Sequence, residues 1–153
     1  MLPILVLIIS YYEQSVRFNE EDYETLAGIW GRSVMATHSF LKKDDFFEIK
    51  AALIPDYYPN VDLNAIADNG VYVGLIGLSP DSIEMLFIDS DRRGQGYGSA
   101  LIEFAKQRGT TKVDVNEQNL SAFNFYKAMG FRIISRDETD DAGRPYPILH
   151  LSL

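Results

Sequence analysis

Cysteine is absent from this chain of 153 residues, and histidine occurs only twice, as His38 and His150. Without cysteine there are no disulfides, no thiolate nucleophile and no cysteine-ligated zinc. Neither histidine has a second ligand at helical spacing, so the sequence predicts no metal site. The lack of cysteine also fits a reducing compartment, and we expect a cytoplasmic protein.

Positive charge is scarce as well, with 14 Lys and Arg against 22 Asp and Glu and a formal charge of −8. Nucleic-acid-binding proteins carry a basic surface, so we expect no nucleic-acid partner. The apolar segment Met1–Ile9 is shorter than the roughly 20 residues that span a bilayer. It also lacks the basic start and cleavage site of a signal peptide. We therefore expect a buried strand there and no membrane partner.

The rest of the chain contains no repeat, low-complexity tract or linker, which indicates a single domain over residues 1–153. Asn19 is a good N-cap for a first helix, and a second helix should stop before Pro55, with a loop over 55–59. The turn at Asp68-Asn69-Gly70 predicts a hairpin. Hydrophobic periodicity predicts further strands at 83–88, 112–115, 131–134 and 148–151, and further helices over 97–105 and 119–129. The order β-α-α-β-β-β-α-β-α-β-β predicts an α/β fold with a mixed sheet and helices on both faces.

Three alternating glycines, Gly94, Gly96 and Gly98, follow a predicted strand and precede an amphipathic helix. Such spacing lets backbone N–H groups converge on an anion, and the first turn of the helix adds positive potential. The adjacent Arg92 and Arg93 would add charge-assisted contacts. A flexible surface turn would explain the pattern less well, so the stretch predicts a phosphate-binding loop.

Two nucleotide-binding motifs match this loop less well. A Walker loop requires a lysine after the glycines, and none follows here. The stretch nearly fits a dinucleotide fingerprint, with Asp114 at the place of the ribose-binding acid, twenty residues after Gly94. However, five residues, 89–93, separate the strand from the first glycine, and no second half of a doubly wound sheet follows. A dehydrogenase therefore ranks as a third alternative.

The segment Leu86–Gly98 resembles the acetyl-CoA motif of the GNAT N-acetyltransferase family. That motif reads glutamine or arginine, two variable residues, glycine, one variable residue, and glycine or alanine. Arg93, Gly96 and Gly98 supply its fixed positions. Val115–Phe131 is similar to the family's C-terminal signature, an asparagine, an alanine, and a tyrosine followed by glycine and phenylalanine. Trp30–Phe40 and Asp140–Leu149 further resemble a bacterial single-domain subgroup, whose members acetylate peptidyl lysine or have no assigned acceptor.

The resemblance implies the GNAT fold, in which the fourth strand splays from the fifth and acetyl-CoA enters the gap. Backbone groups of Phe87 and Ile88 would pair with the pantetheine arm. Asn119 would touch the cosubstrate near the pantetheine, and Tyr126 would face the thioester sulfur. The pyrophosphate would be held by the backbone amides of Arg93, Gly94, Gln95, Gly96, Tyr97 and Gly98.

Direct acetyl transfer to an amine needs no enzyme nucleophile, but it needs a deprotonated amine, a stabilised oxyanion and a proton for the thiolate. A backbone N–H of the splayed strand near Ile88 would bind the oxyanion, and the phenol of Tyr126 would supply the proton. Glu84 is the candidate base, because it precedes Ile88 by four residues on a strand and so should share its face. A solvated glutamate fits that position equally well.

His38 and Asp114 are candidate residues on the substrate side, although a polar helix end and a surface aspartate fit them too. We expect an acetyltransferase that works through a ternary complex and uses no metal. The runner-up is a CoA-binding sensor without catalysis. The acceptor stays open between protein lysine and a small amine, and the oligomeric state between monomer and homodimer.

Overall fold

Residues 6–10 and 18–153 are described by the computed structural model, and the side chains of 6–10 are not. In this part of the chain seven strands form one sheet, in the order β1-β2-β3-β4-β5-β7-β6. Among these strands only the pair β4 and β5 is parallel, which confirms the predicted mixed sheet. The strands are β1 (Val6–Ser10), β2 (Asp62–Asp68), β3 (Val71–Leu78), β4 (Ser82–Ile88), β5 (Lys112–Asn116), β6 (Arg132–Asp137) and β7 (Ile148–Ser152). Within the predicted N-terminal strand, residues 1–5 lie outside the described part of the chain.

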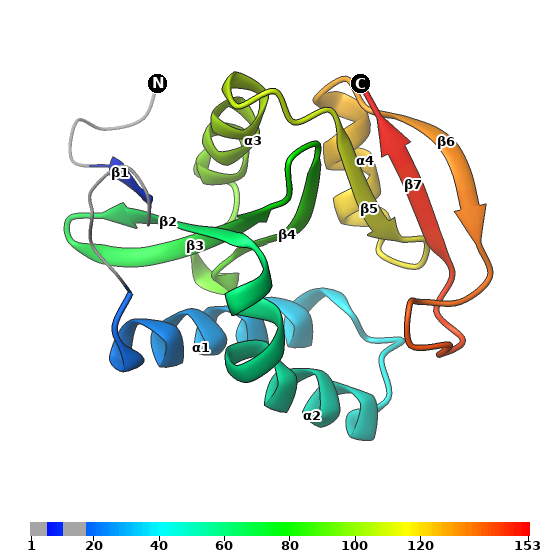
Figure 1. Cartoon of the computed structure of the whole chain (residues 1–153), viewed down its shortest axis with the longest axis horizontal. Coiled ribbons are helices and arrows are strands. Elements are labelled where there is room, and N and C mark those ends of the chain that lie inside the picture. The colour runs from blue at the N-terminus through cyan, green and yellow to red at the C-terminus, as the bar shows by residue number, and fades with distance from the viewer. Residues whose placement is uncertain (1–5, 11–17) are drawn as a thin grey trace.

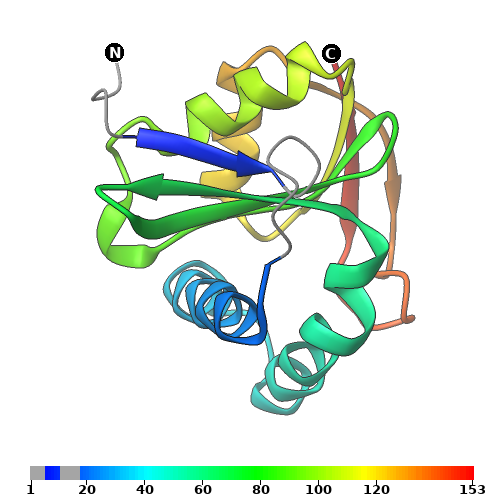
Figure 2. The ribbon, with the colours of Figure 1, turned by 60° about the vertical axis from the view of Figure 1, so that its left-hand side comes forward.

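Helices cover both faces of the sheet, as predicted (Figure 1). They are α1 (Glu20–Thr37), α2 (Lys43–Ala52), α3 (Tyr97–Gln107) and α4 (Leu120–Ala128). Turning the molecule shows α1 and α2 on one side of the sheet and α3 and α4 on the other (Figure 2). The core is accordingly double: one cluster joins α1 to β2 and β3 around Leu26 and Leu75, and another joins α3 to the sheet around Leu101 and Ile76.

The start of α1 is determined locally by a capping box. The side chain of Asn19 accepts a hydrogen bond from the backbone N–H of Asp22 at 2.7 Å, and the Asp22 carboxylate accepts one from the Asn19 N–H at 2.9 Å. These bonds satisfy amides that the first helical turn leaves without partners. Because both partners are three residues apart, the prediction of a helix after Asn19 needed no tertiary information.

The second helix, α2, ends at Ala52, before Pro55 as predicted, but the prediction of a loop over 55–59 was wrong. A π-helix over Leu53–Tyr57 and a 3₁₀ turn over Tyr58–Asn60 follow α2, where a loop from Pro55 was expected. Proline has no N–H for the regular helical ladder. The chain widens at this point, so that the amide of Tyr58 donates to the carbonyl of Leu53. The helical path therefore passes the proline without leaving the core, in which Leu53 and Tyr58 are buried.

The strands β4 and β5 diverge. They pair only at Ser82 with Lys112 and at Ile83 with Val113, so the rest of β4 has no strand partner on that side. On its other side β4 pairs with β3 as far as Ile88, which pairs with Gly74. The far half of β4 thus presents unpaired backbone N–H and C=O groups towards the gap. The splay that the family resemblance implied is present.

Candidate active site

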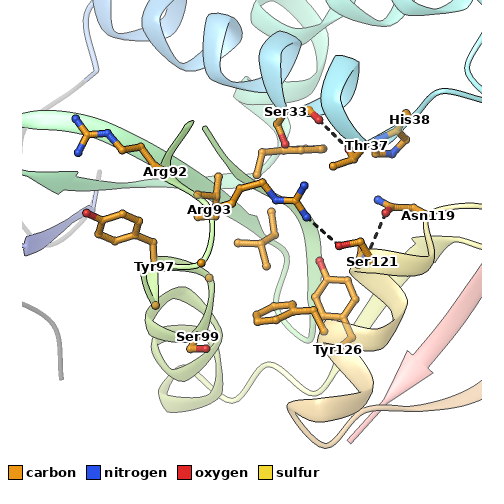
Figure 3. A pocket seen from close by; sticks show the side chains of 18 residues that line it. Ser33, Thr37, His38, Arg92, Arg93, Tyr97, Ser99, Asn119, Ser121 and Tyr126 are labelled. Atoms are coloured by element: carbon orange, nitrogen blue, oxygen red, sulfur yellow. Dashed lines mark hydrogen bonds between the residues drawn. The ribbon is translucent and has the colours of Figure 1, made fainter. Parts of the chain in front are cut away.

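A cavity of about 450 Å³ lies beside the unpaired half of β4 (Figure 3). Four elements supply its walls: the end of α1, the end of β4, the loop that leads into α3, and the first turns of α4. Its lining comprises Ser33, Thr37, His38, Leu86, Phe87, Ile88, Arg92, Arg93, Gly94, Gly96, Tyr97, Gly98, Ser99, Asn119, Ser121, Ala122, Phe125 and Tyr126. Most of the residues expected to bind the cosubstrate therefore line one cavity.

The glycine loop has a backbone conformation that residues with a Cβ atom rarely adopt. Gly94 has φ 77° and Gly96 has φ 89°, both in the left-handed region, where a residue with a Cβ is strained. Gly96 is also the N-cap of α3, so the free amides of the first turn of α3 follow it directly. A Cβ on Gly98 would lie 3.2 Å from the Phe125 ring. The glycine therefore lets α3 pack closely against α4. The loop thus has the backbone geometry of an anion nest.

Side chains on both sides of the loop hold it in place. Nη2 of Arg93 donates to Oγ of Ser121 at 2.8 Å, and Figure 3 shows the guanidinium reaching across the cavity to the start of α4. The Tyr97 hydroxyl donates to the Asp68 carboxylate at the end of β2, and Oε1 of Gln95 lies 3.3 Å from the same hydroxyl oxygen. Gln95 itself is exposed and does not line the cavity. Of the six loop residues expected at the pyrophosphate, it is the one that does not line the cavity.

Tyr126 and Asn119 enter the cavity from α4. The Tyr126 ring is 6% exposed, and Figure 3 shows its hydroxyl directed towards the Arg93 guanidinium. Burial raises the pKa of the Tyr126 phenol, so the group stays protonated at neutral pH. Asn119 is the N-cap of α4 and accepts a hydrogen bond from the Ala122 N–H at 3.2 Å. The cap fixes the first turn of α4, and with it the wall that carries Tyr126.

His38 lies at the opposite wall, at the C-terminal end of α1 (Figure 3). Its Nδ1 is 2.7 Å from the hydroxyl oxygen of Thr37. Burial lowers the pKa of the imidazole to about 4, so the ring is neutral at physiological pH. The structure therefore brings His38 into the cavity of Tyr126.

Glu84 lies elsewhere. A β-bulge between Gly77 and Leu78 of β3 leaves Glu84 without an opposite residue, because Gly77 pairs with Met85 and Leu78 with Ile83. A bulge interrupts the two-residue alternation of side chains, so the expectation that Glu84 and Ile88 share a face is wrong. Glu84 lines a second cavity, of about 440 Å³, against α1 and the segment after α2. Phe87 lines both cavities.

Asp114 does not line either cavity. Its carboxylate is 2.6 Å from Nδ1 of His150, whose Nε2 is 2.6 Å from the carboxylate of Asp137. The three side chains bridge β5, β7 and β6, in that order. Hydrogen bonds to Asp137 and Asp114 raise the pKa of His150, because both carboxylates favour the protonated ring. Asp114 is therefore a partner in a cross-strand ion bridge.

Sequence reasoning missed several residues of the cavity wall. Ser33, Thr37, Ser121 and Phe125 line it, and nothing in their sequence context separates them from ordinary helix residues. A helical spacing of four links Ser33 to Thr37 and Ser121 to Phe125, which places each pair on one helix face. Which face meets the cavity depends on how α1 and α4 pack on the sheet.

Two kinds of feature are absent from residues 6–10 and 18–153. No helix in these ranges combines the length and apolar character that a membrane span requires. Nor do three or more His, Asp or Glu side chains gather there in a cluster suited to hold a metal ion.

Comparison with known proteins identifies the family. The profile of the acetyltransferase (GNAT) domain matches residues 53–146. The chain is 44% identical over 138 residues to the peptidyl-lysine N-acetyltransferase YjaB of Salmonella typhimurium, covering 88% of this chain and 94% of that protein. The chain belongs to the GNAT acetyltransferase family. It is an enzyme that transfers acetyl from acetyl-CoA to an amine, and so the predicted family, activity and cosubstrate are confirmed.

Solved structures agree with this assignment. The solution structure of apo YjaB from Escherichia coli matches with a TM-score of 0.85 and 36% identity, over 97% of both chains. The PaiA N-acetyltransferase of Thermoplasma acidophilum, solved in complex with coenzyme A, matches with a TM-score of 0.66 over 97% of this chain and 99% of that one. At 17% identity the second match concerns the fold alone.

Proposed function

We propose that this enzyme acetylates lysine side chains of proteins and that its chemistry takes place in the cavity beside β4. The observation that carries this proposal is the position of Tyr126, whose phenol faces the same cavity as the glycine loop. A phosphate-binding loop and a protonated phenol in one cavity suit a thioester cosubstrate anchored at its pyrophosphate. The similarity to the peptidyl-lysine acetyltransferase of Salmonella supports lysine as the acceptor.

The residues present fit acetyl-CoA. The left-handed Gly94 and Gly96 allow backbone amides to approach a pyrophosphate without a Cβ in the way. The cationic side chains of Arg92 and Arg93 line the same wall. Next to them, the free edge of β4 at Phe87 and Ile88 offers N–H and C=O groups that an amide-containing arm can pair with. The PaiA structure with coenzyme A is consistent with such a site in this fold.

When bound, acetyl-CoA supplies an acetyl thioester, at whose carbonyl carbon the C–N bond forms while the C–S bond breaks. Tyr126 gives its proton to the leaving sulfur and regains one from the amine nitrogen, which loses it as the amide forms. In water, transfer from a phenol to a thiolate is uphill by roughly 2 kcal/mol. Burial raises the pKa of Tyr126 and would raise that of a thiol in the same surroundings too. Because both pKa values rise, the difference between the phenol and the thiol stays close to its value in water.

The second cavity would bind the approaching acceptor before its amine reaches the cavity of Tyr126. Its walls carry the aromatic rings of Trp30, Tyr57 and Phe87, and its carboxylates are Glu84 and Asp56. Aromatic faces and carboxylates both attract an ammonium group. Glu84 would take the first proton of the ammonium, with water as the carrier, since Glu84 does not line the cavity of Tyr126. A cytoplasmic location, consistent with the absence of cysteine, is part of the same proposal.

The test is to measure thiol release from acetyl-CoA with a panel of amines: lysine-containing peptides, free lysine, a polyamine and an aminoglycoside. We expect release with the peptides, and an acetylated lysine by mass spectrometry. Turnover with only the small amines would reject protein lysine as the acceptor. Tight binding of acetyl-CoA without thiol release for any amine would favour the non-catalytic sensor.

A further inference from the structure

The hydrogen bonds at the end of α1 determine which nitrogen of His38 carries a proton. The Thr37 hydroxyl donates to the backbone carbonyl of Ser33 at 2.8 Å. A threonine hydroxyl has only one hydrogen to donate. Thr37 Oγ1 therefore has only lone pairs to offer to Nδ1 of His38, which lies 2.7 Å away. The proton in that contact must belong to the ring, so Nδ1 is protonated and donates to Thr37.

The remaining nitrogen, Nε2, then carries a lone pair as long as the ring is neutral. Burial keeps it neutral, since it lowers the pKa of His38 to about 4. The charged side chains that line the same cavity, Arg92 and Arg93, are both cationic, so no carboxylate of the cavity lining favours an imidazolium. Within residues 18–153, no side chain forms a hydrogen bond with Nε2. His38 thus presents an unused hydrogen-bond acceptor.

The ring is held where it stands by its neighbours. The backbone N–H of His38 closes the last turn of α1 by donating to the carbonyl of Val34 at 2.8 Å. The ring of Phe40 packs beside the imidazole, with 5.2 Å between the ring centroids. A fixed tautomer on a fixed ring is the property required of a group that orients a substrate.

We propose that Nε2 of His38 accepts a hydrogen bond from the acceptor amine and so directs the nitrogen lone pair at the thioester carbon. This inference rests on the proposed function, because it requires the amine to reach the cavity that His38 shares with Tyr126. No proton transfer to His38 is involved, since a ring with so low a pKa does not retain a proton that an alkylammonium gives up near 10. His38 positions the nucleophile, and the phenol of Tyr126 serves the leaving group.

Nitrogen-15 NMR of the histidine-labelled enzyme reads the tautomer directly. The chain has only two histidines, so a His150→Gln variant assigns both rings. We expect His38 to show a protonated Nδ1 and an unprotonated Nε2, unchanged from pH 8 down to pH 5. His150, held by two carboxylates, should be protonated on both nitrogens near neutrality. A proton on Nε2 of His38, or a titration near pH 6.5, would overturn the inference.

Kinetics of Thr37→Val then test the role. Valine keeps the shape but removes the oxygen that Nδ1 needs, so the tautomers should mix and the KM for a lysine peptide should rise about five- to tenfold. The affinity for acetyl-CoA should stay unchanged. The matched control is Thr25→Val, which removes an equivalent hydroxyl bond on α1, from Thr25 to the carbonyl of Glu21 at 3.0 Å, away from the cavity. Equal KM values in the two variants would contradict the role.

Two substitutions of His38 itself complete the test. Glutamine places an amide oxygen near the position of Nε2 and should retain part of the activity, whereas leucine should lose it. Equal activity of His38→Gln and His38→Leu would show that no acceptor is needed. The NMR result does not depend on turnover, so a failure of the proposed function leaves it readable. If lysine peptides are acetylated while Nε2 proves to be protonated, only this inference fails.

Discussion

Arg32 of α1 holds Asp89, the first residue after β4, through two hydrogen bonds: its Nε and Nη2 each lie 2.9 Å from a carboxylate oxygen. The same carboxylate accepts a bond from the Ser90 N–H at 2.9 Å, where the phosphate-binding loop begins. The backbone N–H of Asp89 donates to Val73 of β3 at 2.8 Å. One residue therefore ties the loop to α1 and to the sheet at once.

Loss of this ion pair should loosen the loop. We expect Arg32→Ala to weaken acetyl-CoA binding about three- to tenfold. Without the ion pair, the loop becomes ordered only when acetyl-CoA binds, and the entropy lost in ordering it reduces the affinity. Stability should fall by only about 0–1 kcal/mol, since the Arg32 side chain is 55% exposed. Titration calorimetry and urea unfolding measure the two effects. The control is Arg136→Ala, which breaks an exposed pair with Glu117 at 2.8 Å on β6 and should leave acetyl-CoA affinity alone.

Gly96→Val should abolish tight binding of acetyl-CoA. The residue has φ 89°, and valine there is strained by roughly 1–3 kcal/mol and puts a side chain into the nest. Gly109→Val provides the control: its φ is 82° and a Cβ would meet nothing within 4 Å, so it carries similar strain without a phosphate site. If both variants bind acetyl-CoA equally well by calorimetry, the pyrophosphate does not lie at this loop.

Tyr126→Phe tests the proton donor. The ring remains, so we expect kcat and kcat/KM to fall together while acetyl-CoA affinity stays close to wild type. A fall of about tenfold corresponds to only ~1.4 kcal/mol and indicates positioning, whereas a larger fall supports donation. With acyl donors whose thiol leaves more readily, the difference in kcat between wild type and Tyr126→Phe should become smaller. Full activity would show that the phenol is structural.

Tyr58→Phe is the matched control for that substitution. Tyr58 is 2% exposed, and its buried hydroxyl has no hydrogen-bond partner among the residues that the structure describes. It lines neither the cavity of Tyr126 nor that of Glu84. Removing an unpaired buried hydroxyl should leave turnover unchanged and stability equal or higher. Steady-state rates measure the turnover, and thermal unfolding measures the stability.

Glu84→Gln should lower turnover by roughly 10²–10⁴ if this carboxylate takes the proton of the acceptor. Acetyl-CoA affinity should barely change, because Glu84 lines the other cavity. Glu103→Gln, on the exposed side of α3, controls for the lost charge. The same acidic limb in the pH–rate profiles of wild type and Glu84→Gln would point to a different base.

The bridge at His150 should make stability depend on pH. Its pKa in the folded protein lies above the ordinary 6.5, because Asp137 and Asp114 favour the protonated ring. The stabilisation is therefore complete below pH 6.5 and is lost as the pH rises through the folded value. Urea unfolding of wild type and His150→Gln should show a difference that shrinks from pH 6 to pH 9. If the difference in the free energy of unfolding did not change with pH, His150 would stabilise the protein by packing and not by its charge.

Elements that depend on neighbours in the sequence were predictable. Asn19 and Asp22 form a cap three residues apart, and the Asn69-Gly70 turn adopts φ 52° and 78°, as a two-residue hairpin requires. The glycine loop belongs to the same class, because its geometry depends on the missing Cβ atoms of Gly94 and Gly96. For this reason the sequence alone was enough to predict the position of the loop, whereas the cosubstrate was predicted from the resemblance of the surrounding motifs to the GNAT family.

Pairings between distant segments decided the rest. The bulge that moves Glu84 into the second cavity exists only because β3 and β4 pair in a shifted register. Asp114 is drawn to His150, 36 residues away in sequence, once β5 lies beside β7. His38 of the α1 end and Tyr126 of α4 line the same cavity, although 88 residues of sequence separate them. Local sequence encodes backbone conformation, whereas side-chain partners follow from strand register and helix packing, which only the whole fold determines.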